Sequence, residues 1–144
     1  RYAKGENHCD REKDLSHSYM RMDLSKCINC SRCVRACDEV QGQFTLTMTG
    51  RGFESRITTD NDMLFGDSSC VSCGACAQTC PTSAISDVFQ SKSIEADKTV
   101  RTTCSYCGVG CNLEVAVKSD EVLSIHAPQD AVNAGHTCFN FRKS

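Results

Sequence analysis

The sequence carries one cysteine-rich run twice, as CINCSRCVRAC at residues 27–37 and as CVSCGACAQTC at residues 70–80. Every cysteine of the first run has a counterpart 43 positions further along the chain, so C-x2-C-x2-C-x3-C is an internal repeat. Disulfide frameworks use even numbers of cysteines, whereas this chain has 13 and places them in tight groups. The repeat therefore indicates a site that gathers thiolates around a metal-containing group.

The spacing of the run is the one used by bacterial ferredoxins that hold two 4Fe–4S clusters. In that motif three closely spaced thiolates bind one cluster, and the fourth cysteine of the run binds the other cluster. We therefore expect two crossed ligand sets, namely Cys27, Cys30, Cys33 and Cys80, and Cys70, Cys73, Cys76 and Cys37. Zinc is the alternative, although zinc ligands usually come as separated C-x2-C pairs in which a third nearby cysteine has no role.

A third group of cysteines follows the repeat and differs from it in spacing. Its members are Cys104, Cys107, Cys111 and, after 26 intervening residues, Cys138. Gly108 and Gly110 lie within this group, and glycine allows the backbone to approach an inorganic core closely. We expect a third 4Fe–4S cluster here, with a structural zinc ion as the alternative.

The remaining cysteine and the histidines are not expected to bind metal. Cys9 has no partner at a ligand spacing, so it is predicted to be a non-ligand thiol. A lone histidine is usually exposed or hydrogen-bonded locally, and this is expected of His8, His17, His126 and His136. Basic residues beside the first run are interpreted as part of a solvated face: Lys26, Arg32 and Arg35.

Composition narrows the class of protein. Hydrophobic residues make up 40% of the 144, but this figure includes the cysteines, so little aliphatic material remains for a core. The net charge is −2 with both signs interspersed, which predicts no nucleic-acid partner. No apolar run is long enough to span a membrane, and the expected localisation is cytoplasmic. Because the first residue is Arg1, we expect a processed product or a piece of a longer chain.

The pattern between the cysteine groups predicts an α+β fold in three parts: an N-terminal arm at 1–22, a two-cluster ferredoxin-like domain at 23–98 and a small β-rich 4Fe–4S domain at 99–144. A helix is expected at 34–40, and alternating residues at 44–48 and 53–58 predict a hairpin inserted between the two runs. Further strands are expected at 84–88, 100–103, 113–118 and 122–126, with a polar linker at 90–98 and a turn at 119–120.

Beyond these patterns, the residues resemble a known family. Residues 26–44, 50–54 and 70–85 resemble the ferredoxin region in the large subunit of soluble, NAD-dependent, molybdopterin-type formate dehydrogenases. Residues 99–138 resemble the 4Fe–4S domain that opens the molybdopterin oxidoreductase superfamily. That family usually has a lysine two residues after the last cluster cysteine, where this chain has Asn140, with Lys143 close by.

The resemblance implies a path for electrons and no substrate-transforming site within these residues. Electrons from formate, oxidised at a molybdenum or tungsten pterin centre outside this segment, would cross three 4Fe–4S clusters to a flavin and NAD module. The expected partners are the other subunits or domains of such a complex, including a 2Fe–2S protein. A free-standing polyferredoxin carrier, a related hydrogenase subunit and a zinc-bound interaction module are the alternatives.

The ligand list makes a direct prediction for two cysteines. Cys76→Ala should abolish electron passage through the ferredoxin pair, because a cluster loses one of its four thiolates, whereas Cys9→Ala should leave it intact. Visible absorption and iron content after anaerobic reconstitution check both variants. Bleaching of a cluster in Cys9→Ala contradicts the list.

Overall fold

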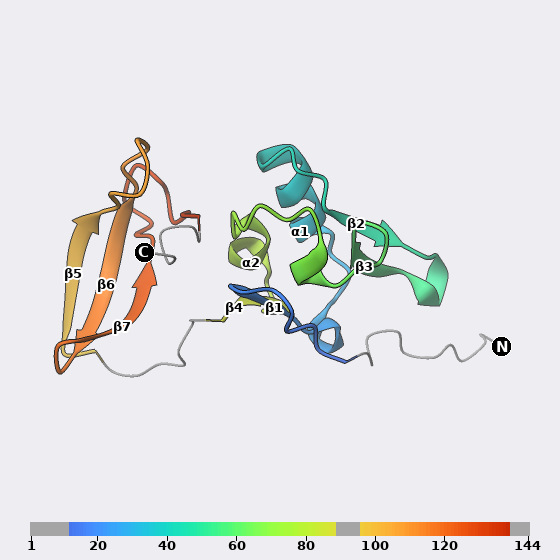
Figure 1. The fold of residues 1–144 in the computed structure, drawn as a ribbon, viewed down its shortest axis with the longest axis horizontal. Helices are drawn as coiled ribbons and strands as arrows, with labels where there is room; N and C mark the ends of the chain where they lie inside the picture. The colour runs from blue at the N-terminus through green and yellow to red at the C-terminus, as the bar shows by residue number, and fades with distance from the viewer. Residues whose placement is uncertain (1–11, 89–95, 139–144) are drawn as a thin grey trace. The chain divides into compact units, whose positions relative to one another are not determined.

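The computed structural model describes residues 12–88 and 96–138 (Figure 1). Contacts divide the chain into two compact units, residues 1–88 and 89–144. Both short helices and strands are present, as expected for a small α+β chain. The domain limits at 22/23 and 98/99 stay a prediction, and the linker expected at 90–98 lies mostly outside the described residues.

Each cysteine run of the first unit leads from a loop into a short helix. The first helix, α1 (Arg32–Arg35), continues as a π-helical turn, η2 (Ala36–Val40), and the second is α2 (Ala75–Thr79). The residue before each helix is left-handed, with φ of 58° at Ser31 and 77° at Gly74, which turns the chain sharply out of the loop. The helix expected at 34–40 is confirmed and begins two residues earlier.

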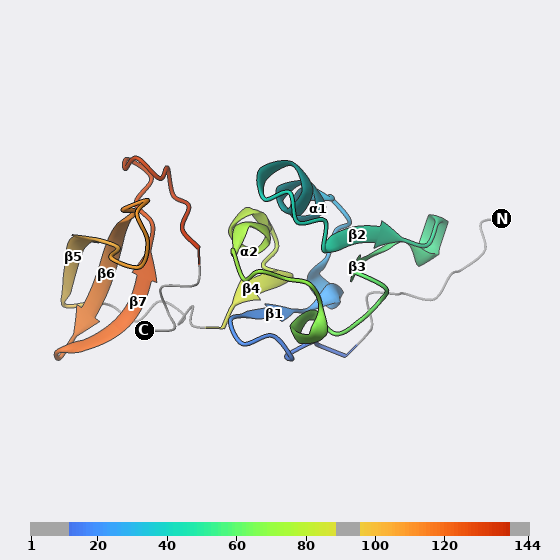
Figure 2. The same ribbon diagram turned by 45° about the horizontal axis from the view of Figure 1, so that its top comes forward.

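A two-stranded sheet lies beneath α2 in the first unit. Strand β1 (Met20–Met22) pairs antiparallel with β4 (Ile85–Asp87), so that Met22 lies opposite Ile85. Figures 1 and 2 show α2 over this pair. The last residues of the arm expected at 1–22 are therefore part of the first unit. Met20 and Met22 are buried in its core, and Arg21 between them is exposed.

The hairpin expected between the two runs is present. Strands β2 (Leu46–Thr49) and β3 (Arg56–Thr59) pair antiparallel, and the short 3-10 turn η3 (Gly52–Glu54) connects them. Both strands begin later than expected, because Phe44 adopts a left-handed conformation and η3 occupies the start of the second segment. The inner ends of the hairpin place Leu46 and Ile57 in the core, which also contains Phe65 of the 3-10 turn η4 (Phe65–Asp67).

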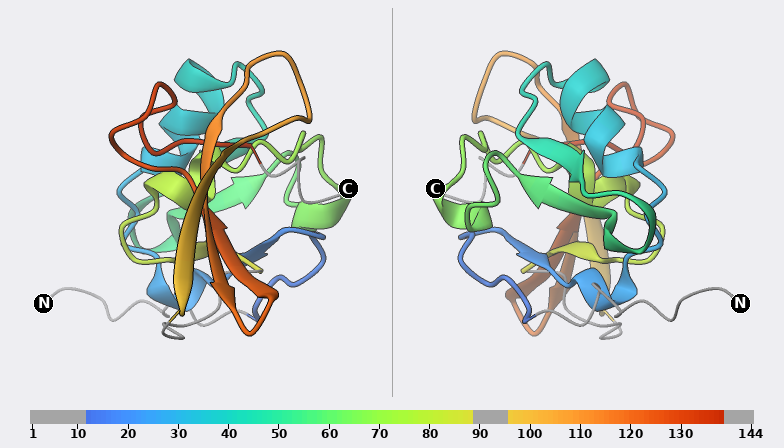
Figure 3. Two further views of the ribbon diagram at one scale, coloured as in Figure 1. Left: turned by 90° about the vertical axis from the view of Figure 1, so that its left-hand side faces the viewer. Right: turned by 90° about the vertical axis from the view of Figure 1, so that its right-hand side faces the viewer.

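The second unit is a three-stranded antiparallel meander, seen from both sides in Figure 3. Its strands are β5 (Lys98–Thr103), β6 (Asn112–Lys118) and β7 (Glu121–His126). Ser119 and Asp120, both with positive φ, make the two-residue turn that favours a tight hairpin. The three expected strands and their turn are thus confirmed, and β5 begins inside the expected linker.

Substitutions at the two hairpin glycines, Gly50 and Gly52, distinguish the effect of backbone strain from that of steric clash. Both have positive φ, but a Cβ at Gly50 meets the Glu54 carbonyl oxygen at 2.3 Å, whereas nothing lies within 4 Å of a Cβ at Gly52. Gly52→Ala should lower the free energy of unfolding by about 1 kcal/mol, and Gly50→Ala by about 2 kcal/mol or more. Urea midpoints of the reconstituted chains check this difference, and equal midpoints would refute it.

Candidate metal centres

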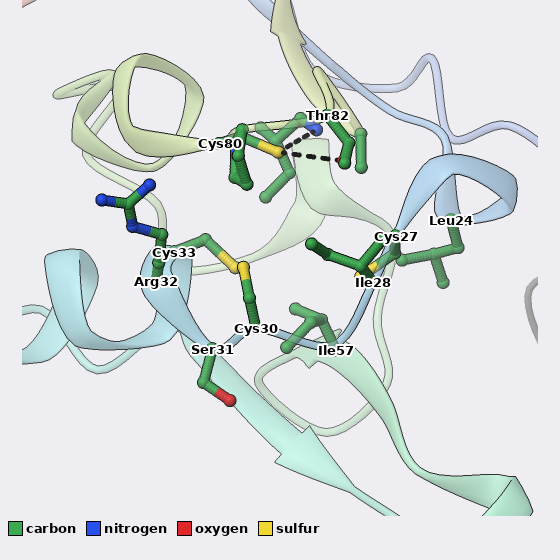
Figure 4. Close-up of a pocket in the computed structure, with 13 residues that line it drawn as sticks. Leu24, Cys27, Ile28, Cys30, Ser31, Arg32, Cys33, Ile57, Cys80 and Thr82 are labelled. Atoms are coloured by element: carbon green, nitrogen blue, oxygen red, sulfur yellow. Dashed lines mark hydrogen bonds between the residues drawn. The ribbon is translucent and has the colours of Figure 1, made fainter.

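Four thiols from distant parts of the first unit line one pocket, which we call the first pocket. Cys27 and Cys30 come from the loop before α1, Cys33 from α1 itself, and Cys80 from the segment after α2. Figure 4 shows Cys80 across the pocket from Cys30 and Cys33, with Ile28 and Ile57 along one side. The structure therefore brings together one of the two crossed sets, whose role as ligands stays a prediction.

The second crossed set lines another pocket, which we call the second pocket. Its thiols are Cys37 from η2, Cys70 and Cys73 from the loop before α2, and Cys76 from α2. Buried Met20 and Phe65 are also part of the lining, and Met20 Sδ lies 3.7 Å from Cys76 Sγ. No disulfide joins cysteines anywhere in residues 12–88 or 96–138, as the sequence predicted.

The backbone of the two cysteine loops has the same shape at repeat-related positions. Asn29 and its counterpart Ser72, each directly before the second cysteine of its run, have φ of 53° and 57°. The two loops therefore turn in the same direction at this position. The N–H of Asn29 donates to Cys27 Sγ and the N–H of Ser72 to Cys70 Sγ, each at 3.4 Å. Successive N–H groups in such turns form a concave site for anions, which suits thiolate and sulfide.

The pKa values of the thiols depend on burial. Burial raises the pKa of Cys33 to about 11, and the neighbouring thiols add to this. Burial likewise raises the pKa of Cys76 well above its usual value. Both thiols are thus protonated near neutral pH when no metal is bound, so binding a metal centre must release protons.

Cys80 behaves differently from these two thiols. Burial raises its pKa, but hydrogen bonds from its neighbours more than offset this and leave the pKa below its usual value. Ile85 N–H donates to Cys80 Sγ at 3.5 Å, and Thr82 Oγ1 lies 3.9 Å from the same sulfur. These donors stabilise a negative sulfur at the end of α2.

The donor set fits a polynuclear iron–sulfur centre. Each pocket offers four thiols, which are the soft ligands that iron–sulfur clusters take. The thiols surround a volume, and the loop amides that donate to them supply the hydrogen bonds typical of cluster sulfurs.

His17 is a buried residue whose role the sequence did not reveal. Its Nδ1 accepts hydrogen bonds from the N–H groups of Tyr19 and Met20 at 3.1 and 3.2 Å, as the expectation of local bonding predicted. Because Nδ1 accepts twice, the proton lies on Nε2, which is 3.3 Å from Ser72 Oγ in the second cysteine loop. Burial lowers the pKa of His17, which favours this neutral form, although nearby Asp14 opposes the shift.

The third cysteine group lies at one end of the β5–β6 hairpin. Cys104 N–H donates to Cys111 O at 2.8 Å, which closes the loop that carries Cys107. Gly110 has φ of 63° here, so this turn depends on glycine. The backbone thus brings Cys104 and Cys111 together, while the convergence of all four thiols stays a prediction.

Two polar side chains hold the segment that leads to Cys138. Asn133 Oδ1 accepts from Asn112 N–H at 3.0 Å, and its Nδ2 donates to the carbonyls of Asn112 and His136 at 3.1 and 2.7 Å. Arg101 donates to both carboxylate oxygens of Asp130 at 2.9 and 2.8 Å. No cysteine pattern marks these residues, and only the structure identifies them as anchors of the returning segment.

Known families of iron–sulfur domains match the cysteine-rich segment of each unit. Residues 26–84 match the family model of the 4Fe-4S dicluster domain, and residues 97–140 match that of the molybdopterin oxidoreductase Fe4S4 domain. One iron–sulfur domain family thus matches a segment of the first unit, and another matches a segment of the second. The predicted iron–sulfur character is thereby confirmed, as is the resemblance to the molybdopterin oxidoreductases.

Two curated relatives extend the similarity across both units. "Probable oxidoreductase YjgC" of Bacillus subtilis is 32% identical over 173 aligned residues, which span 92% of this chain and 18% of the relative. A "Putative formate dehydrogenase" of Staphylococcus haemolyticus is 32% identical over 168, spanning 88% of this chain and 17% of the relative. The chain thus spans less than a fifth of the length of these relatives.

A solved structure shares part of the fold. An NAD+-reducing [NiFe]-hydrogenase in the H2-reduced state is 28% identical, with a TM-score of 0.52 over 62% of this chain and 38% of its own. Among the described residues, every helix is too short or too polar to cross a membrane. Cys9, His8, Asn140 and Lys143 lie outside the described residues.

The contacts of His17 predict a large effect of its removal. His17→Ala should lower the free energy of unfolding by about 2–4 kcal/mol, because the ring is buried against Phe65 and pairs with three polar groups. His126→Ala is the matched control, since His126 is exposed and should change stability by less than about 0.5 kcal/mol. Equal losses of the free energy of unfolding in the two variants, measured by denaturant titration, would show that the contacts of His17 do not stabilise the fold.

Proposed function

We propose that this chain is an electron-transfer segment of a formate dehydrogenase-like molybdopterin oxidoreductase, carrying three 4Fe–4S clusters. The observation that carries the proposal is the crossing of the thiols: each pocket of the first unit takes three cysteines from one run and one from the other. This is the ligand pattern of two-cluster bacterial ferredoxins, and the first unit matches the dicluster domain family. The finer fold assignment is a bacterial-type ferredoxin with a hairpin insertion.

The two pockets and the family match of the second unit support three proposed ligand sets. They are Cys27, Cys30, Cys33 and Cys80; Cys70, Cys73, Cys76 and Cys37; and Cys104, Cys107, Cys111 and Cys138. A 4Fe–4S cluster supplies a one-electron acceptor and donor. The residues of this chain hold the thiolates in place and direct N–H groups at them, so that an electron moves with little rearrangement.

The wider setting is inferred from the named relatives. One relative is named a putative formate dehydrogenase, and the structural neighbour is an NAD+-reducing hydrogenase. We infer a multisubunit complex in which this segment links a molybdenum or tungsten pterin site to a flavin and NAD module and a 2Fe–2S protein. The cytoplasm is the proposed location.

A hydrogenase subunit is the second candidate, favoured by the hydrogenase neighbour. A free-standing polyferredoxin is the third. Size-exclusion of native material separates the two kinds of role, because a subunit elutes with a larger protein whereas a carrier elutes alone. The identity of the co-eluting protein then separates a formate dehydrogenase from a hydrogenase.

Metal content tests the number of clusters. Anaerobically reconstituted chain should contain about twelve iron and twelve acid-labile sulfide per polypeptide, because each 4Fe–4S cluster contributes four of each. About eight of each would remove the third site, and a colourless, folded zinc protein would refute the proposal.

Removal of iron should leave the chain largely unfolded by circular dichroism, because no metal centre then holds its thiols together.

A further inference from the structure

The fourth cysteine of the second run has hydrogen-bond donors directed at its sulfur. Helix α2 ends at Thr79, and Pro81 has no N–H with which to continue a helix. The chain therefore turns after Cys80 and brings Ile85 N–H to 3.5 Å and Thr82 Oγ1 to 3.9 Å from its Sγ (Figure 4). Toward a thiolate, both groups can act only as donors.

The corresponding cysteine of the first run has different neighbours. Cys37 lies inside η2, where the helix continues through Val40. Gly42, the repeat counterpart of Ile85, donates its N–H to Asp38 O at 2.8 Å. Glu39, the counterpart of Thr82, carries a carboxylate that accepts hydrogen bonds when ionised and cannot donate. At the two positions that correspond to the donors of Cys80, the first run therefore has an amide that already donates to a carbonyl and a side chain that is an acid.

The surroundings of the two pockets differ in the same sense. The first pocket is lined by the cationic Arg32 and by Cys30, which is exposed. Among the described residues, the lining of the second pocket has no charged side chain; it includes fully buried Met20 and Phe65 together with Gln43 and Thr45. The carboxylate of Asp60 accepts from Ser69 N–H at 2.7 Å and from Ser69 Oγ at 3.0 Å, one residue before Cys70 of the second pocket.

These differences bear on where an added electron resides. A reduced cluster is more negative than an oxidised one, so donors to its sulfurs, a nearby cation and access to solvent all raise its reduction potential. A nearby carboxylate lowers it. The donors at Cys80, the cation of Arg32 and the exposure of Cys30 therefore favour a higher reduction potential at the first pocket, and Asp60 favours a lower one at the second.

We infer that the site of Cys27, Cys30, Cys33 and Cys80 has a higher reduction potential than the site of Cys37, Cys70, Cys73 and Cys76, and that Thr82 is a positioning residue that contributes to this order. The inference rests on the proposed function. Within the pair, one electron then passes from the second site, which is oxidised, to the first, which is reduced. No bond forms or breaks, and no proton is transferred.

An EPR-monitored redox titration of the full 144-residue chain, reconstituted anaerobically and reduced with dithionite, tests the order. Thr82→Val should lower one reduction wave, with a three- to tenfold loss in the reduction equilibrium, and about 59 mV corresponds to tenfold for one electron. Thr82→Ser keeps a hydroxyl and should keep the wild-type wave. Asp60→Asn retains an acceptor for Ser69 N–H and should raise a different wave.

The order is supported if the wave that Thr82→Val moves lies above the wave that Asp60→Asn moves. It is overturned if the two waves lie in the opposite order or coincide, or if Thr82→Val moves no wave. Should Asp60→Asn fail to bind clusters, Asp60→Ser takes its place, because it also removes the carboxylate charge while keeping an oxygen that can accept from Ser69 N–H, and it should raise the same wave. Failure of the proposed function has a separate signature, namely no iron, no sulfide and no EPR signal in the wild-type chain.

Discussion

The first unit depends on one constraint: neither cysteine run can complete a four-thiol pocket from its own residues. Cys80 must cross to the loop that begins at Cys27, and Cys37 must cross to the loop that begins at Cys70. The packing of α1 against α2 and the pairing of β1 with β4 bring these partners together. A metal centre in either pocket therefore ties both halves of the unit to each other, which suits a chain with few aliphatic residues.

The sequence predicted the features that follow from spacing and periodicity. The crossing of the thiols was expected from the known geometry of the motif, and the three strands of the second unit, with the turn at Ser119 and Asp120, were expected from alternating residues. These features are local, or they follow from a motif with known geometry. Alternation over a few residues was enough for strands, although their first residues were displaced by turns such as η3.

Features that depend on tertiary contacts were not predictable in this way. Met20 and Met22 form too short a pattern to separate a strand from an extended arm, and their burial follows from β4, more than 60 residues away. His17 looked like any single histidine, because its partner Ser72 lies in the second cysteine loop. Asn133 and Arg101 were missed for the same reason: their value comes from backbone and carboxylate groups that only the fold brings near.

The proline that follows Cys80 has a consequence for how duplicated motifs diverge. One helix stops at Thr79 where the other continues through Val40, and the amide of Ile85 and the hydroxyl of Thr82 then reach Cys80, while each pocket still gathers four thiols. Selection can therefore adjust the surroundings of one half without altering any cysteine of the repeat. The same thiol spacing in two halves of a protein does not require them to remain interchangeable.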